Sequence, residues 1–328
     1  MNIPVFKDIV ASPIVQRLLE EHKFEMSNSS YSLWACRVRG LLGHCLRLQP
    51  AQKGSLALDY GTSIHAGLEK LMLGEDLDSA TEAFIKTATE LNIDKWLDDK
   101  RCINRGIETL AAWQMYKRNL IHDYQAIEMD INGENGRAVE LSVHKQVGEF
   151  DTRIGYVCGY WSGRVDAVVK YKDRLWILDH KTSSMLGDKF LDDKLRSNQF
   201  LGYWFLLNDT IRKQFGENLA GVLLNVICTG RKEVAFETYE VPFAEWQIQE
   251  WFEETKINLG KIINYLVNIT EIDNPRALQE RELCVGKYGK CPFFDVCNTT
   301  ENARKSIIEH GYVRRVVEPT NLEKTIEG

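Results

Sequence analysis

Two acidic residues and one lysine stand where polar side chains interrupt neighbouring apolar segments. Asp166 ends the stretch Gly163–Asp166, and Asp179 and Lys181 lie within Ile177–Thr182. Charged groups in such segments are costly to bury unless they are paired or bind a metal ion. A short turn between two strands would bring the carboxylates together. Two converging carboxylates and a lysine suit a Mg²⁺ or Mn²⁺ site that cuts phosphodiester bonds.

Further polar residues flank this pair in a fixed order. His65 follows Gly61 after three residues. It lies in the segment 62–73, whose apolar residues recur at helical spacing. Gln199 and Tyr203 stand one turn apart in a predicted helix over 192–207, so they share a face. Along the chain the motifs read G-x-x-x-H, G-x-x-D, D-x-K and Q-x-x-x-Y. Any one of them is weak evidence, whereas the ordered set is specific.

This set of motifs resembles the PD-(D/E)XK nuclease superfamily, in particular its RecB-like branch. The resemblance covers residues 28–300. The chain departs from the family pattern in having Val165 where a proline commonly precedes the first acid, and in having aspartate rather than glutamate at 179. Both departures are familiar in the RecB-like branch.

The resemblance implies a role for each motif residue. The divalent metal would be held by His65, Asp166, Asp179 and the backbone carbonyl of His180. The imidazole would favour Mn²⁺ somewhat over Mg²⁺. Lys181 would orient or activate the attacking water, and Gln199 and Tyr203 would position the phosphate backbone or a DNA end. The structural alternatives are an ion pair at a strand end, an ordinary hydrogen-bonded helix histidine and an amphipathic helix with an ordinary tyrosine.

Four cysteines resemble the iron–sulfur subgroup of the same branch, which includes AddB and the exonucleases of CRISPR adaptation. Cys36 lies far upstream of Cys284, Cys291 and Cys297. Four thiolates suffice for a [4Fe–4S] cluster, whose role would be structural; the alternatives are zinc bound by four cysteines and no metal at all. Six residues separate Cys284 from Cys291, where the family more often has two. Cys45 is an alternative ligand to Cys36. The remaining cysteines, Cys102, Cys158 and Cys228, lie in apolar patterns typical of buried positions.

The composition is that of an ordinary globular protein. The 328 residues include 44% hydrophobic and 27% charged residues, and the net charge is −6. A nuclease needs a local basic groove rather than a basic average, and Arg37, Arg39, Arg47 and Lys53 could supply part of one. There is no apolar run long enough to span a bilayer and no secretory signal, so we expect a cytoplasmic location without disulfides.

The element pattern predicts an α/β protein, and the resemblance implies a restriction-endonuclease-like core, a mixed central sheet flanked by helices. We expect a single domain made of N-terminal helices (1–75), a helical insertion (76–136), the nuclease core (137–270) and a cysteine segment with a tail (271–328). Strands are expected at 139–147, 154–158, 163–171, 175–179, 222–228 and 233–241. Helices are expected to begin at Ser12–Pro13 and to run over 33–47, 62–73, 76–128, 192–207 and 244–267.

These features favour a metal-dependent deoxyribonuclease, most simply an exonuclease acting on single strands or DNA ends, with 5′ to 3′ polarity favoured by the resemblance. Its setting would be recombination, repair, or phage or CRISPR-related DNA processing. The chain has no phosphate-loop motif, so a helicase partner would be a separate chain, and an oligomer is possible. The alternatives are a DNA-end or single-strand binding module, a structure-specific endonuclease, and an enzyme of another class that uses the acids for different metal chemistry.

Overall fold

The chain forms two compact units, each built from discontinuous segments. The computed structural model describes residues 8–51, 56–91, 101–120, 123–192, 194–195, 197–230, 233–269, 280–286, 289–315 and 325–327. The first unit comprises Met1–Lys53, His144–Ser162 and Glu250–Thr320; the second comprises Gly54–Val143, Gly163–Gln249 and Asn321–Gly328. Strands β6 (Val139–Thr152) and β7 (Gly155–Tyr171) and helix α10 (Glu245–Val267) carry residues of both units. No helix in the described part of the chain is both long enough and apolar enough to cross a membrane.

A mixed sheet forms the centre of the second unit. The later half of β7 pairs antiparallel with β8 (Arg174–Ser183), β8 pairs parallel with β9 (Gly221–Cys228), and β9 pairs antiparallel with β10 (Ala235–Pro242). Every residue of β9 is buried, as its continuous apolar run predicts for a central strand. Lys172 and Asp173 turn the chain between β7 and β8, both with positive φ (48° and 57°), as tight hairpin turns require.

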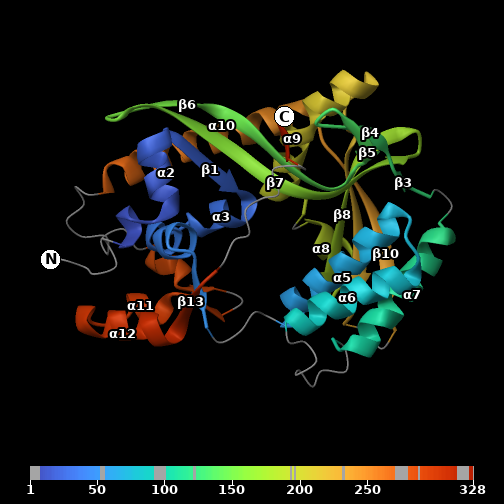
Figure 1. Cartoon of the computed structure of the whole chain (residues 1–328), viewed down its shortest axis with the longest axis horizontal. Coiled ribbons are helices and arrows are strands. Elements are labelled where there is room, and N and C mark those ends of the chain that lie inside the picture. Colours follow the sequence, from blue (N-terminus) through green and yellow to red (C-terminus); the bar gives the residue numbers. More distant parts are fainter. Residues whose placement is uncertain are drawn as a thin grey trace. The chain divides into compact units, whose positions relative to one another are not determined.

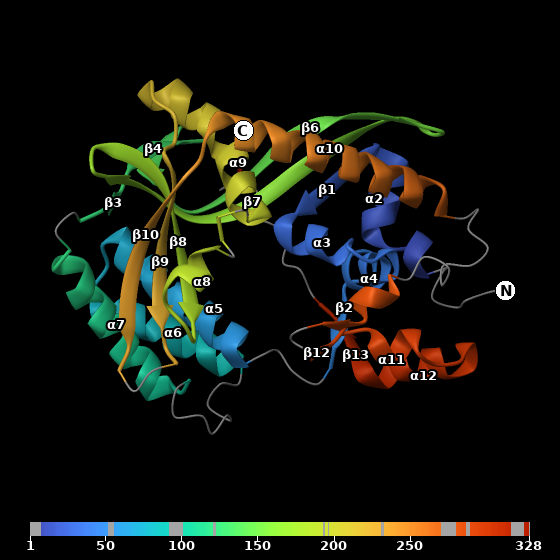
Figure 2. The ribbon, with the colours of Figure 1, turned by 180° about the vertical axis from the view of Figure 1, so that it is seen from behind.

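Helices cover both faces of this sheet. Helices α5 (Leu56–Leu73), α6 (Leu77–Glu90) and α7 (Ile103–Arg118) lie over one face, whereas α8 (Asp188–Asp192) and α9 (Asn198–Phe215) lie over the other (Figures 1 and 2). The core under the first three helices is continuous with the sheet. Its largest members include Tyr60, Ile64, Phe84, Trp113, Val169, Trp176 and Leu223.

Short strands complete the second unit. Strand β3 (Gln125–Ala126) pairs with β7, and β4 (Glu128–Ile131) forms a hairpin with β5 (Glu134–Arg137). Strand β14 (Thr325–Glu327) neighbours β6 in the strand order.

The first unit combines N-terminal and C-terminal segments with part of β6 and β7. Its elements are α2 (Pro13–Glu21), β1 (Lys23–Ser27), α3 (Asn28–Leu33), α4 (Arg37–Gly40), the π-helix η1 (Leu41–Cys45), β2 (Leu48–Pro50), the 3₁₀ helix η5 (Arg281–Leu283), β11 (Val285–Gly286), β12 (Gly289–Lys290), α11 (Phe294–Cys297), α12 (Glu301–Gly311) and β13 (Tyr312–Arg314). Strand β1 pairs parallel with Cys158–Ser162 of β7, and β2 pairs with β13.

The predicted fold class is confirmed, whereas several element boundaries are wrong. The predicted helix over 33–47 is three shorter pieces, because a capping box of Ser27 and Ser30 starts α3 early and Cys36 is extended (φ −128°, ψ 124°). The predicted helix over 76–128 ends at Arg118, within the residues described, and strands β3 to β5 complete the expected helical insertion. The strands predicted at 154–158 and 163–171 are one strand, β7. Gly159 packs within it: a Cβ there would lie 2.6 Å from the Phe150 ring.

Candidate functional site

The two motif acids lie at corresponding positions of neighbouring strands in the second unit. The β7–β8 register pairs Ala167 with Leu178, so Asp166 and Asp179 follow at the next position of each strand. The backbone N–H of His180 donates a hydrogen bond to Asp166 Oδ2 at 2.7 Å. The hairpin expected from the sequence therefore brings the two carboxylates together at one end of the β7–β8 ladder.

Lys181 pairs with the more deeply buried acid. Its Nζ lies 2.7 Å from Oδ1 and 2.5 Å from Oδ2 of Asp179, whose side chain is 1% exposed. Nζ also lies 5.9 Å from the centre of the Phe200 ring. Asp179 Oδ2 is buried, and besides this ion pair it accepts no hydrogen bond from any described residue. The ion pair thus leaves lone pairs on this oxygen that a bound cation could use.

His65 reaches the acids from helix α5. A Cβ on Gly61, one turn earlier, would lie 2.8 Å from Thr182 Oγ1 of β8, so the glycine permits the close approach of the helix to the strand. His65 Nδ1 lies 3.4 Å from Asp166 Oδ2. Burial alone would lower the pKa of His65, but the Asp166 carboxylate outweighs it and the net pKa is raised.

Glu140 belongs to the same site, although the sequence motifs do not assign it a role. A donor atom from each of His65, Glu140 and Asp166 lies within 4.8 Å of the other two, and among described residues this is the one such group of three metal-ligand side chains. The Glu140 side chain is 11% exposed and hydrogen-bonds Arg164 Nε. Its position at the start of a predicted strand was the sole signal available from the sequence.

The pKa values reflect three carboxylates crowded into a poorly solvated site. Burial, together with the negative charge of Asp166, raises the pKa of Glu140 to about 7. Burial also raises the pKa of Asp179, against the opposing effect of Lys181. Burial acts in the same sense on Asp166, but the nearby His65 and Lys181 charges hold its pKa below the usual range. Because carboxylates and an imidazole are ligands for Mg²⁺ and Mn²⁺, the donor set fits a divalent cation.

The ring of His180 is held by a buried polar row that crosses the sheet. Asn225 Oδ1 accepts hydrogen bonds from Trp113 Nε1 at 2.9 Å and from His180 Nδ1 at 3.0 Å. Asn225 Nδ2 donates to Thr238 Oγ1, which lies 3.0 Å from the hydroxyl of Tyr116. Because the indole N–H can only donate, Asn225 presents its oxygen and His180 carries its proton on Nδ1.

Through this polar row, a helix of the helical insertion helps to hold the His180 ring. Trp113 and Tyr116 come from α7, a segment in which the sequence showed no chemistry. The signal that could have revealed the row is Asn225, one polar residue in the middle of a fully buried strand. A buried amide in such a place requires partners, so at least one neighbouring element had to supply them.

Gln199 and Tyr203 lie together on the opposite helix, α9. Gln199 Nε2 donates a hydrogen bond to the Tyr203 hydroxyl at 2.7 Å. Burial, followed by the carboxylates of Asp179 and Asp166, raises the pKa of Tyr203 well above its usual value, so the phenol stays neutral. A Cβ on Gly163 would lie 3.0 Å from the Tyr203 ring, so this motif glycine makes room for the tyrosine.

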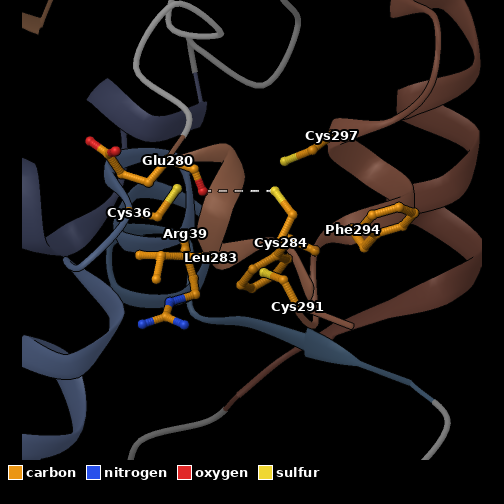
Figure 3. Close-up of a pocket in the computed structure, with 9 residues that line it drawn as sticks. Cys36, Arg39, Glu280, Leu283, Cys284, Cys291, Phe294 and Cys297 are labelled. Carbon is orange, nitrogen blue, oxygen red and sulfur yellow. Dashed lines mark hydrogen bonds between the residues drawn. The ribbon is translucent and has the colours of Figure 1, made fainter. Parts of the chain in front are cut away.

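The four predicted cluster cysteines line one pocket of the first unit. Figure 3 shows Cys36 on one side and Cys284, Cys291 and Cys297 on the other, with Arg39, Glu280, Leu283, Phe293 and Phe294 completing the lining. Burial, together with the neighbouring thiols, raises the pKa of Cys297 to about 11. Burial likewise raises the pKa of Cys291. Thiols in this setting become thiolates readily only if a metal stabilises the charge.

The six-residue spacing between two of these cysteines is closed by a hairpin. Strands β11 and β12 pair antiparallel, and Cys291 N–H donates to the carbonyl of Cys284 at 2.8 Å. The spacing therefore still places the two residues side by side. Cys45, the alternative ligand, is fully buried and is absent from the pocket lining, and its pKa is strongly raised by burial.

The residues proposed for a basic groove have other contacts in the first unit. Arg37 lies 5.4 Å above the Tyr265 ring. Arg39 donates hydrogen bonds to the carbonyls of Ser32 and Leu33. Lys53 lies outside the described residues. Two of the four arginine and lysine side chains thus serve local packing.

The mixed sheet, its flanking helices and the acid pair on a β-hairpin define a restriction-endonuclease-like α/β fold. A family model described as "PD-(D/E)XK nuclease superfamily" matches residues 26–298. The chain belongs to this superfamily, whose members are nucleases that use divalent metals. No curated protein matches the chain.

Two solved structures are similar over most of their length. One is the crystal structure of a "Putative exonuclease" from Eubacterium rectale, 15% identical, covering 87% of this chain and 90% of that one with a TM-score of 0.46. The other is the crystal structure of SSO0001, 14% identical, covering 78% and 84% with a TM-score of 0.27. Both scores are low, so the family assignment rests on the family model.

Replacing Asn225 with leucine should destabilise the chain. The substitution keeps the volume but leaves the Trp113 and His180 N–H groups without their acceptor, and each buried unpaired group costs about 1–3 kcal/mol. Urea unfolding of Asn225→Leu and of Thr238→Val compares their free energies of unfolding. Thr238→Val is the control, because it leaves the Trp113 and His180 N–H groups paired with Asn225. Equal stability of Asn225→Leu and wild type would contradict the proposed importance of the row.

The raised pKa of Glu140 predicts a pH-dependent effect of Glu140→Gln. The folded pKa, about 7, exceeds the unfolded value, so folding carries no penalty from this group at low pH and a growing one as pH rises from about 4.5 through 7. Without divalent cations, Glu140→Gln should therefore gain stability relative to wild type between pH 5 and pH 8. Urea unfolding at both pH values tests this, and a pH-independent difference would refute it.

Proposed function

We propose that this protein is a divalent-metal-dependent deoxyribonuclease, acting as an exonuclease on single-stranded DNA or DNA ends. The observation that carries the proposal is the convergence of Asp166, Asp179 and Lys181 with His65 in one site of a PD-(D/E)XK nuclease. Polarity from 5′ to 3′ is favoured by resemblance to the RecB-like branch. Recombination, repair, or phage or CRISPR-related processing, with a separate helicase, would be its setting.

In the proposed site each residue has a task that its contacts support. Asp166, Asp179 and His65, with the His180 carbonyl, would hold the cation, and Glu140 offers a further oxygen. The cation would supply positive charge for the phosphate and lower the pKa of a bound water.

The remaining residues act directly on the substrate. Lys181 would stabilise the negative charge that develops on the phosphate, because its ammonium is held at the site by Asp179. The neutral hydroxyl of Tyr203 and the amide of Gln199 would donate hydrogen bonds to backbone phosphates, which fixes the strand without reading its sequence.

We further propose that Cys36, Cys284, Cys291 and Cys297 hold a [4Fe–4S] cluster. One observation supports it: the four side chains line one pocket. A zinc ion bonded by the same four thiolates at about 2.3 Å is the alternative. The cluster would tie Cys36 to the C-terminal segment of the first unit, which is a structural role.

Lys181→Ala should abolish DNA cleavage while leaving DNA binding in place. The test is an assay on end-labelled single-stranded DNA with Mn²⁺ or Mg²⁺, using protein purified without oxygen. We expect wild type to cut in a metal-dependent way and the variant to be slower by at least about 10²-fold, because a charge aimed at the reacting phosphate is lost.

Other outcomes of this assay favour the alternatives. Cutting of closed circular single strands would indicate an endonuclease. A wild type that binds DNA but cuts no faster than Lys181→Ala would indicate a binding module. A wild type that neither binds nor cuts DNA would contradict the proposed function.

Cys36→Ser and Cys45→Ser distinguish the proposed cluster ligand from its neighbour. Purified without oxygen, wild type and Cys45→Ser should both show iron-dependent visible absorbance, whereas Cys36→Ser should lose most of it. Iron and zinc analysis of the same samples identifies the metal. Stoichiometric zinc without iron in wild type, or loss of absorbance in Cys45→Ser alone, would contradict the assignment.

A further inference from the structure

Glu140 belongs both to an ion pair and to the group of side chains that could hold a cation. Its carboxylate hydrogen-bonds Arg164 Nε, and it also lies within 4.8 Å of donor atoms of His65 and Asp166. The first contact is an ion pair at the edge of the site. The second places the same carboxylate in the group that fits a divalent cation. A cation bound by that group would therefore compete with the guanidinium for Glu140.

Glu140 has an unusual backbone conformation and a largely buried side chain, whereas the Arg164 side chain is exposed. Glu140 has a positive φ of 53°, a conformation that residues with a Cβ adopt at a cost and that is concentrated at functional sites. Its side chain is 11% exposed, against 67% for Arg164. Arg164 stands two residues before Asp166 on β7, so the two side chains share a face of the strand.

We propose that Glu140 exchanges partners: it pairs with Arg164 in the cation-free chain and becomes a ligand of the divalent cation, together with His65 and Asp166, when the site is loaded. The Arg164 guanidinium released in this way binds a backbone phosphate of the nucleic-acid substrate. This inference rests on the proposed function, since it requires a metal-dependent site that acts on a phosphodiester.

The chemistry of the groups favours this exchange. The repulsion between Glu140 and Asp166 contributes to the raised pKa of Glu140. A divalent cation between the two carboxylates offsets this repulsion more than one exposed guanidinium does. Glu69 adds further negative charge near Arg164 and Glu140. A guanidinium binds phosphate oxygens through two parallel hydrogen bonds, and an exposed arginine at the rim of the site can reach a strand.

The exchange couples the two ligands. A bound cation makes Arg164 available for DNA, so by linkage bound DNA must strengthen cation binding by the same factor. An arginine that only neutralises the site would weaken cation binding whether or not Glu140 is present. In an exchange, Arg164 affects cation binding only when Glu140 is present. A double-mutant cycle of Arg164 and Glu140 therefore distinguishes the exchange from a general charge effect.

The first arm of the test measures Mn²⁺ affinity by calorimetric titration without DNA. We expect Arg164→Gln to bind Mn²⁺ about fivefold more tightly than wild type, and Glu140→Gln to bind it at least about fivefold more weakly. Arg164→Gln should have no effect in the Glu140→Gln background. Equal tightening in both backgrounds, or none in the wild-type background, would overturn the proposal.

A matched control guards against general charge effects. Arg212 is also exposed (60%) and paired, with Asp209 at 3.2 Å, but it is not among the residues that form the site. Arg212→Gln should leave Mn²⁺ affinity unchanged. If it tightens binding as much as Arg164→Gln does, long-range electrostatics explains the result and the exchange is refuted.

The second arm measures the salt dependence of single-stranded DNA binding in the Lys181→Ala background, where cleavage is blocked. Lys181→Ala and Arg164→Gln/Lys181→Ala should show equal slopes without Mn²⁺. With Mn²⁺ the slopes should differ by about 0.7, the contribution of one phosphate contact on a single strand. Equal slopes with Mn²⁺, or a difference already present without it, would contradict the release of Arg164.

The outcomes also separate this inference from the proposed function. A wild type that binds Mn²⁺ and cuts DNA, with an Arg164→Gln variant of unchanged Mn²⁺ affinity, overturns the exchange alone. A wild type that binds no Mn²⁺ overturns both.

Discussion

The repulsion between three buried carboxylates is the constraint on which the site depends. Glu140, Asp166 and Asp179 come from three neighbouring strands and meet where little water can screen them. Lys181 and His65 offset part of this repulsion: Lys181 pairs with Asp179, and His65 lies beside Asp166. The site keeps a net negative charge, and a divalent cation neutralises it more effectively than another side chain would.

The scaffold around these acids is specialised to hold them in place. The β7–β8 hairpin sets the separation of Asp166 and Asp179, and the backbone of His180 fixes one of the carboxylate oxygens. Gly61 lets α5 approach β8 closely enough for His65 to reach the acids. The His180 side chain lies on the face of β8 opposite to Asp179 and Lys181, where the buried row through Asn225 holds its ring. Small residues and satisfied polar groups thus restrict the motion of the charged ones.

The cysteine pocket follows a similar plan in the first unit. A two-strand hairpin brings Cys284 beside Cys291, and the extended backbone of Cys36 interrupts the N-terminal helices at the pocket. Antiparallel pairing of the short strands places two cysteines of one segment side by side. The thiol pKa rises there for the same reason as the carboxyl pKa at Glu140, since burial disfavours the charged form of both groups.

Much of the fold and part of the site could be predicted from the sequence. Alternating and continuous apolar runs identified β8, β9 and β10, and the motif spacing correctly grouped Asp166, Asp179 and Lys181. Glu140 could not be assigned because its role depends on the pairing of β6 with β7 and on a left-handed backbone, neither of which has a local sequence signal. Trp113 was missed because its partner, Asn225, lies more than a hundred residues away.

The central claim is that the crowded carboxylates form a divalent-cation site. Anomalous diffraction from crystals soaked in Mn²⁺ tests it most directly, because the signal locates the ion independently of activity. We predict a peak within bonding distance of oxygen atoms of Asp166 and Asp179 and of a ring nitrogen of His65, with Glu140 as a further oxygen ligand. A fully occupied peak elsewhere, or none at saturating Mn²⁺, would contradict the account.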